Sequence, residues 1–318
     1  DMEKLTVGAN DAGQRLDKFL SKTFRNLPKS MMYKFIRTKK IKVNRKRADA
    51  GQMLAAGDTV ELFVLPEFLE RAPSEALFKN IRPAFEVVYE DENLIVCNKP
   101  VGMLSHSDSA GERNTLIEHV KAYLWRKGEY EPEKENSFAP ALCNRIDRNT
   151  SGLVLAAKNA EALRILNEKI KKRTITKYYL CRVHGVPAPQ EATLEGYLIK
   201  DAGANRVTVY KSIPRGARGD FKKIITKYRV LDAEKEEAVL EVELVTGRTH
   251  QIRAHMASIG HPLVGDGKYA ENGADRAAGR YRQALCAYKI RFEKDEPSAL
   301  SYLEGRTFSL EMKKISFL

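Results

Sequence analysis

NRIDRNTSG, residues 144–152, runs directly into the apolar segment LVLAA at residues 153–157. A polar stretch that ends in glycine and is followed by five apolar residues predicts a turn leading into a buried strand. A carboxylate in such a turn, here Asp147, is anchored by the strand yet remains reachable, as a catalytic group must be. Taken alone, Asp147 could equally cap the turn or pair with Arg145 or Arg148.

Short segments rich in β-branched and aromatic residues surround this turn. They are FEVVYE (85–90), NLIVCNKP (93–100), TKYYLCRVHG (176–185), ATLEGYLIK (192–200), RVTVYKS (206–212), ITKYRVLD (225–232) and AVLEVELVT (238–246). The polar turn 233–237 predicts that the last two form a hairpin. Helices are predicted near 115–125 and at 160–172. Because strands and helices do not alternate regularly, the pattern predicts an α+β fold with a mixed, largely antiparallel sheet.

A smaller α+β unit is predicted at residues 12–65. Two amphipathic segments predict helices, one around Leu16 and Phe19 and one after Pro28, and strands are predicted around Ile41 and at 59–64. Residues 66–82 show no sustained periodicity and are interpreted as a linker. The larger domain is therefore predicted to span residues 83–318.

Positive charge is concentrated in the smaller unit. The chain has a net charge of +13, and residues 15–47 contain thirteen basic residues opposed only by Asp17. Such a cationic module on a nearly neutral body predicts a polyphosphate partner. The alternative, a solvated basic face, is disfavoured by the near absence of acidic residues. The residues of the module predicted to contact this polyphosphate are Arg37, Lys39, Lys40, Lys42, Arg45, Lys46 and Arg47.

Other features of the composition exclude several classes of site. The four cysteines are scattered, which argues against a disulfide framework and a zinc site. His250, His255 and His261 lack the one-turn spacing of helical metal ligands, so no metal is predicted. No apolar stretch is long enough to cross a bilayer, and the first residues lack the features of a secretory signal. These observations predict a cytoplasmic protein.

Two further segments carry polar residues at the end of an apolar strand. In KYYL (177–180), alternation places Tyr178 and Tyr179 on opposite faces of a strand, where cross-strand packing is the simpler interpretation of either ring. TGRTHQIRAH (246–255) is interpreted as a strand ending at Gly247 and a helix capped by Thr249 or its neighbour. Arg248 and Arg253 would then lie on different faces of that helix, so at most one is expected at a site.

The combination of these segments, in this order, resembles a known family. NRIDRNTSG, KYYL and TGRTHQIR with GHPLVGDGKY (260–269) resemble the signature segments of the RluA-type pseudouridine synthases, over essentially all of residues 85–318. The segment from QRLDKFLSKTF to DAGQMLAAGDTVEL resembles the ribosomal-protein-S-four-type (alpha-L) RNA-binding domain. The likeness is greatest to the RluC and RluD branch, whose substrates are uridines of large-subunit ribosomal RNA.

The resemblance implies roles for individual residues. Asp147 is expected to be the catalytic aspartate, Tyr179 the aromatic residue beside the target uracil, and Arg253 the partner of the aspartate. Arg145 and Arg148, which flank Asp147, join the expected RNA contacts. Asn144 departs from the family, which usually has histidine there, and is expected to serve structure or RNA contact.

The expected reaction moves uracil from its N1 bond to a C5 bond on the same ribose, so it requires no cofactor. Asp147 could attack the anomeric carbon or remove a ribose proton, and both routes stay open. RNA rather than DNA is the expected partner, and a monomer is expected. The competing hypotheses are a catalytically silent RNA-binding ribosome-assembly factor, a metal-dependent nuclease and a synthase that acts on transfer RNA.

Overall fold

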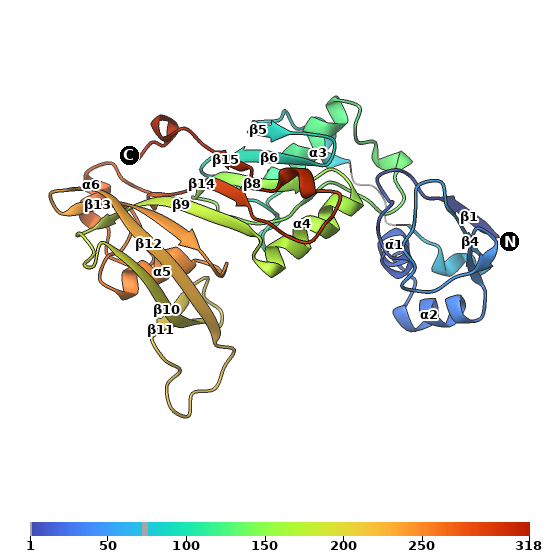
Figure 1. Cartoon of the computed structure of the whole chain (residues 1–318), viewed down its shortest axis with the longest axis horizontal. Helices are drawn as coiled ribbons and strands as arrows, with labels where there is room; N and C mark the ends of the chain where they lie inside the picture. The colour runs from blue at the N-terminus through green and yellow to red at the C-terminus, as the bar shows by residue number, and fades with distance from the viewer. Residues whose placement is uncertain (1, 72–75) are drawn as a thin grey trace.

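The computed structural model describes residues 2–71 and 76–318, which form a small N-terminal module and a larger domain, each built on one sheet (Figure 1). The module's sheet has four antiparallel strands in the order β1-β4-β2-β3. Its elements are β1 (Glu3–Thr6), α1 (Leu16–Thr23), α2 (Lys29–Arg37), β2 (Ile41–Val43), β3 (Lys46–Arg47) and β4 (Thr59–Leu62).

The two helices of the module are amphipathic, as predicted, and their apolar sides form one core with the sheet. Phe19 from α1 and Phe35 from α2 are buried in this core together with Ile41 from β2. The strand β1 was not predicted, and it pairs with β4 so that Leu5 lies opposite Val60. The sheet of the module therefore begins before residue 12.

The segment that follows the module contains short 3₁₀ turns instead of periodic elements. These are η1 (Pro66–Phe68) and η2 (Leu77–Asn80). Residues 72–75 of the predicted linker lie outside the described residues.

The module also contacts the larger domain directly. The carboxylate of Asp11 accepts hydrogen bonds from the backbone N–H groups of Ser137 and Phe138, both at 3.0 Å. Another contact joins the N–H of Ala160 to the carbonyl of Asn10 at 2.8 Å. Residues 10 and 11 are thus part of the interface between the two parts.

The larger domain is built on an eleven-stranded sheet. Its strands are β5 (Glu86–Glu90), β6 (Leu94–Lys99), β7 (Ala141–Leu142), β8 (Ser151–Ala157), β9 (Ile175–His184), β10 (Glu191–Lys200), β11 (Val207–Tyr210), β12 (Lys222–Glu234), β13 (Glu237–Leu244), β14 (Leu285–Phe292) and β15 (Thr307–Ser309). Its helices are α3 (Leu116–Arg126), α4 (Ala160–Lys172), α5 (Gln251–Ser258) and α6 (Gly273–Ala277), with 3₁₀ turns η3 (Pro132–Lys134), η4 (Ser301–Leu303) and η5 (Met312–Lys314). None of the helices that the structure describes is long and apolar enough to cross a membrane.

The strand order is β11-β10-β12-β13-β9-β14-β8-β6-β5, with β15 beside β14 and β7 beside β8. Among the described pairs, β14 and β8 are parallel and the others are antiparallel. The predicted α+β fold with a mixed, largely antiparallel sheet is confirmed. The predicted hairpin is confirmed as well, since β12 and β13 pair across the two residues 235–236.

Gly152 explains why the motif at 144–152 ends in glycine. Its φ is +124°, and a Cβ at this position would lie 2.1 Å from the carbonyl oxygen of Ala287. Gly152 pairs with Ala287 where the parallel strands β8 and β14 meet. The close approach of two backbones therefore requires a residue without a side chain.

The sheet separates two cores. One contains apolar residues of α3 and α5, and the other contains those of α4 and the C-terminal segment after β14. Alternation along β9 places Tyr179 in the first core and Tyr178 against the second, as predicted. The face that carries Tyr179 is the one that bears the site described below.

Candidate active site

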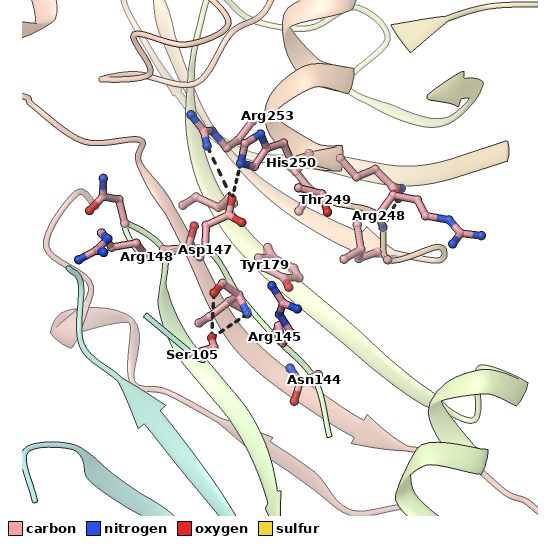
Figure 2. A pocket seen from close by; sticks show the side chains of 18 of the residues that line it. Ser105, Asn144, Arg145, Asp147, Arg148, Tyr179, Arg248, Thr249, His250 and Arg253 are labelled. Atoms are coloured by element: carbon pink, nitrogen blue, oxygen red, sulfur yellow. Dashed lines mark hydrogen bonds and ion pairs between the residues drawn. The ribbon is translucent and has the colours of Figure 1, made fainter. Parts of the chain in front are cut away.

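A cavity of about 940 Å³ lies over the middle of the large sheet and is called the central cavity here. It is lined by the turn between β7 and β8, by the start of β9, and by the segment from the end of β13 into α5. Asp147, Tyr179 and Arg253 all line it, and so do Arg145 and Arg148 (Figure 2). The structure thus brings together in one cavity five residues from three separate segments.

The turn that carries Asp147 is fixed by two residues outside it. The hydroxyl of Ser105 donates to the carbonyl of Ile146 at 2.9 Å and accepts from the N–H of the same residue at 3.3 Å (Figure 2). The fully buried ammonium of Lys99 donates to the Arg148 carbonyl at 3.1 Å, and burial lowers its pKa to about 8. Asp147 is therefore held on both sides while its side chain remains 31% exposed.

Arg253 binds a second carboxylate more closely than it binds Asp147. Its Nε and Nη2 donate to Asp266 at 2.7 and 2.9 Å, whereas Nη1 lies 3.7 Å from Oδ2 of Asp147. Asp266 is buried and also accepts from the backbone N–H of Lys268 at 3.0 Å. Burial is the largest single influence and would raise the pKa of the Asp266 carboxyl, but the bonds and charge of Arg253 together with the backbone N–H groups of Lys268 and Tyr269 lower it overall. Arg253 is thus fixed by Asp266 and directs its remaining nitrogen at Asp147.

His250 is a second basic group beside Asp147 that the sequence did not indicate. Its Nε2 lies 3.9 Å from Oδ2 of Asp147, and its Nδ1 is 2.6 Å from the hydroxyl of Tyr269. Burial lowers the pKa of His250, and the negative charge of Asp147 only partly opposes this. At neutral pH the imidazole is therefore uncharged, and Arg253 is the cation that faces Asp147 (Figure 2).

The predicted position of the N-cap of α5 is confirmed, since the cap residue is His250, the neighbour of Thr249, whereas the predicted end of the preceding strand at Gly247 is wrong. β13 ends at Leu244, before Gly247, and the residue that precedes α5 is His250, which has a φ of +54° and no capping bond from its side chain. The side chain of Gln251 instead accepts from the backbone N–H of Arg248 at 3.1 Å and from the hydroxyl of Thr246 at 2.9 Å.

At most one of the two arginines was predicted to point at a given site, and Arg253 is the one directed at Asp147, since the side chain of Arg248 extends away from it (Figure 2). Both Arg248 and Arg253 line the central cavity. Arg248 lies before the helix begins, so helical spacing does not separate the two side chains.

Tyr179 is buried at the base of the cavity. Burial raises the pKa of its phenol, and the neighbouring Asp147 adds to this effect. The phenol is therefore protonated at neutral pH. On the other face of the sheet, Tyr178 lies beneath the ammonium of Lys289, 4.4 Å from the ring centre.

Of the flanking residues, Arg145 and Arg148 are exposed at the cavity, and Arg148 lies 3.6 Å from a carboxylate oxygen of Asp108. Asn144 is half-buried and also lines the cavity. Its side-chain oxygen accepts from the N–H of Leu155 at 2.8 Å, which ties the turn to β8. This bond gives Asn144 a structural role.

The predicted RNA contacts of the module lie at the end of α2, in the turn from α2 to β2, in β2 and β3, and in the turn between these two strands. Six are exposed, and Lys42 is half-buried with its ammonium 5.5 Å from the ring centre of Phe63. Arg45 lies 3.9 Å from Glu61. The exposed six are Arg37, Lys39, Lys40, Arg45, Lys46 and Arg47.

Known families match both parts of the chain. Residues 93–258 match the family model described as RNA pseudouridylate synthase, and residues 14–60 match that of the S4 domain. The chain is 34% identical to the ribosomal large subunit pseudouridine synthase C of Vibrio vulnificus over 289 residues, which cover 88% of this chain and 85% of that protein. It is 32% identical to the protein of the same name from Escherichia coli over 274 residues, which cover 86% of this chain and 81% of that protein.

Solved structures agree on the fold. Human RNA Pseudouridylate Synthase Domain Containing 4 superposes with a TM-score of 0.56 at 21% identity, covering 71% of this chain and 87% of that one. Human RNA Pseudouridylate Synthase Domain Containing 1 superposes with a TM-score of 0.53 at 22% identity, covering 76% of this chain and 95% of that one.

Proposed function

Because the chain belongs to the RNA pseudouridylate synthase family, we propose that it isomerises specific uridines of large-subunit ribosomal RNA to pseudouridine. The observation that carries the proposal is the meeting of a carboxylate, a phenol ring and a guanidinium, from Asp147, Tyr179 and Arg253, in one cavity. The relatives whose names include the ribosomal large subunit cover most of this chain and support the choice of substrate.

The reaction breaks the bond between the ribose and N1 of uracil, turns the base, and joins C5 to the same carbon. The proton on C5 leaves and N1 gains one, so the atoms balance without a redox partner. Asp147 supplies the anionic group near the sugar, as a nucleophile or as a base. Arg253 faces Asp147 and orients its carboxylate, and Tyr179 stacks beside the uracil as a neutral phenol.

A uridine that is stacked within folded RNA cannot reach Asp147, so the nucleotide must flip into the central cavity. The volume of about 940 Å³ is sufficient for a nucleotide. Arg145 and Arg148, exposed on either side of Asp147, bind the phosphates of the flipped strand.

The division of the chain follows from this function. Residues 12–65, which form the module together with β1, bind RNA; residues 66–82 connect the module to residues 83–318, which carry out catalysis. The module binds RNA phosphates through its exposed basic residues and thereby keeps the catalytic domain near the target uridine. The protein acts as a monomer in the cytoplasm, without a cofactor.

One assay tests the activity. Wild-type protein is incubated, without added metal, with ribosomal RNA that carries tritium at C5 of uridine. We expect release of tritium into water, because C5 must lose its proton when it bonds to the ribose. Cut strands would indicate a nuclease, and binding without release or cleavage would indicate a silent assembly factor. Parallel incubation with transfer RNA tests the alternative substrate.

Removing charge from the module should weaken RNA binding and its dependence on salt. We expect the combined substitution of Lys39, Lys40, Lys46 and Arg47 by alanine to flatten the slope of log affinity against log salt by about three, if each residue contacts one phosphate. The measurement is RNA affinity at several salt concentrations. These exposed residues are preferable to a truncation, because Asp11 in the same module binds the larger domain.

The control is the combined substitution of Lys171, Lys235, Lys294 and Lys313, four exposed lysines of the larger domain that line neither described cavity. It removes the same charge and should leave the slope nearly unchanged. An equal change in both variants would mean that RNA responds to net charge rather than to the module.

A further inference from the structure

A second cavity, called the α2 hollow here, lies in the N-terminal module. It has a volume of about 490 Å³ and is lined by α2 and by residues 47–52. Its lining includes Tyr33, Arg37, Arg47 and Asp49. An aromatic ring, two cations and one acceptor are thus gathered around a space that can hold one nucleotide.

Tyr33 is exposed but is held in place. It is 46% exposed, and its hydroxyl donates to Oδ2 of Asp17 at 3.2 Å. Asp17 is itself held by Arg15, whose Nε and Nη2 donate to it at 3.1 and 2.8 Å. The ring is therefore fixed at its polar end while much of its surface remains open for stacking.

The charged groups of the α2 hollow are available for a ligand. Within the part of the chain that the structure describes, neither Arg37 nor Arg47 has an ion-pair partner, and both side chains are exposed. Asp49 accepts one bond, from the N–H of Gly51 at 2.8 Å, through Oδ1. A carboxylate repels phosphate but accepts bonds from the N–H groups of a nucleobase, so the hollow offers partners for both parts of a nucleotide.

We infer that the α2 hollow binds a single unpaired nucleotide of the RNA, with its base stacked on Tyr33, its phosphates bound by Arg37 and Arg47, and its N–H edge facing Asp49. A base within a duplex is stacked on both faces, whereas a base in a bulge or loop has a face that is free to stack on a protein ring. This inference rests on the proposed function, because it takes RNA as the ligand. The inference goes beyond the proposed function in one respect: the module recognises an unpaired base in addition to binding the phosphates of the RNA backbone.

The test compares two labelled RNAs, a duplex with a single-nucleotide bulge and the same duplex without it, by fluorescence anisotropy with the full chain. Wild-type protein should prefer the bulged RNA. Tyr33→Ala should bind the bulged RNA about tenfold more weakly, with the duplex affinity and the salt slope unchanged. Tyr33→Phe should bind both RNAs like wild type, because it keeps the ring. Arg37→Ala should flatten the salt slope by about one.

Tyr302→Ala is the matched control. Tyr302 is 47% exposed and its hydroxyl also donates to an aspartate, Asp91, but it lines neither cavity. This variant should bind both RNAs like wild type.

Three results would overturn the inference: no preference of wild type for the bulge, unchanged binding of the bulged RNA by Tyr33→Ala, or equal weakening in Tyr33→Phe. Failure of wild type to bind either RNA would instead reject RNA as the partner and with it the proposed function.

Discussion

Replacing Asp147 with asparagine should abolish turnover, lowering the rate by at least about 10⁴-fold, while RNA affinity changes less than about twofold. Asparagine has nearly the same shape but cannot act as an anionic nucleophile or as a base. The residue is 31% exposed within a turn held by Ser105 and Lys99, so the substitution should leave the fold intact. The measurements are tritium release in a single turnover and RNA affinity by anisotropy.

Asp108→Asn provides a control within the same cavity. Asp108 also lines the central cavity and is 36% exposed, close to the exposure of Asp147, and it lies beside Arg148. Because its ion-pair partner is Arg148 and not Arg253, this variant should retain turnover within several-fold. Retained turnover in Asp147→Asn would reject the role proposed for Asp147. Equal loss in both variants would show that the cavity requires negative charge in general.

The fold was predictable where short-range patterns carried the information. Helix α4 matches the predicted bounds, and its start follows from Asn159, whose side chain accepts from the N–H of Ala162 at 2.8 Å. The hairpin of β12 and β13 follows from the polar turn between two alternating segments. Strand β14 was not assigned, although it lies in the middle of the sheet. Its pairing with β8 joins residues more than 130 positions apart, which local patterns cannot indicate.

The candidate site was also predictable only in part. Placing Asp147, Tyr179 and Arg253 together required the resemblance to a family, because nothing in the spacing of three separate segments requires them to meet. The contributions of His250 and Asp266 were missed. Asp266 lies in the segment 260–269, which entered the sequence analysis only through the family resemblance, and only the fold shows that its carboxylate faces Arg253. His250 was considered only as a metal ligand, and its contact with Tyr269 depends on tertiary structure.

The geometry around Arg253 gives Asp266 a positioning role. An arginine held only by Asp147 could follow that carboxylate, whereas two short bonds to the buried Asp266 fix the guanidinium independently of it. Asp147, whose Oδ2 lies 3.7 Å from Nη1 of Arg253, makes no comparably short bond to the guanidinium. Asp266 therefore acts through Arg253 and does not itself need to touch the substrate.

Asp266→Asn and Asp266→Ala should each lower the rate of the chemical step by about 100-fold, because displacing an aligned group by about 1 Å costs this much. RNA affinity should change little. The alanine variant leaves the buried Arg253 without its partner and should also lose about 3–5 kcal/mol of stability, so melting temperatures are measured alongside and the asparagine variant serves if alanine does not fold.

The decisive test measures the effect of Asp266→Asn in a variant that lacks the guanidinium of Arg253. If Asp266 acts only by positioning Arg253, then adding Asp266→Asn to Arg253→Met should change the single-turnover rate less than about twofold, although it costs about 100-fold in wild type. A residue that merely supports the fold would slow both backgrounds alike. Full additivity of the two substitutions would thus contradict the positioning role and leave Asp266 as a structural residue.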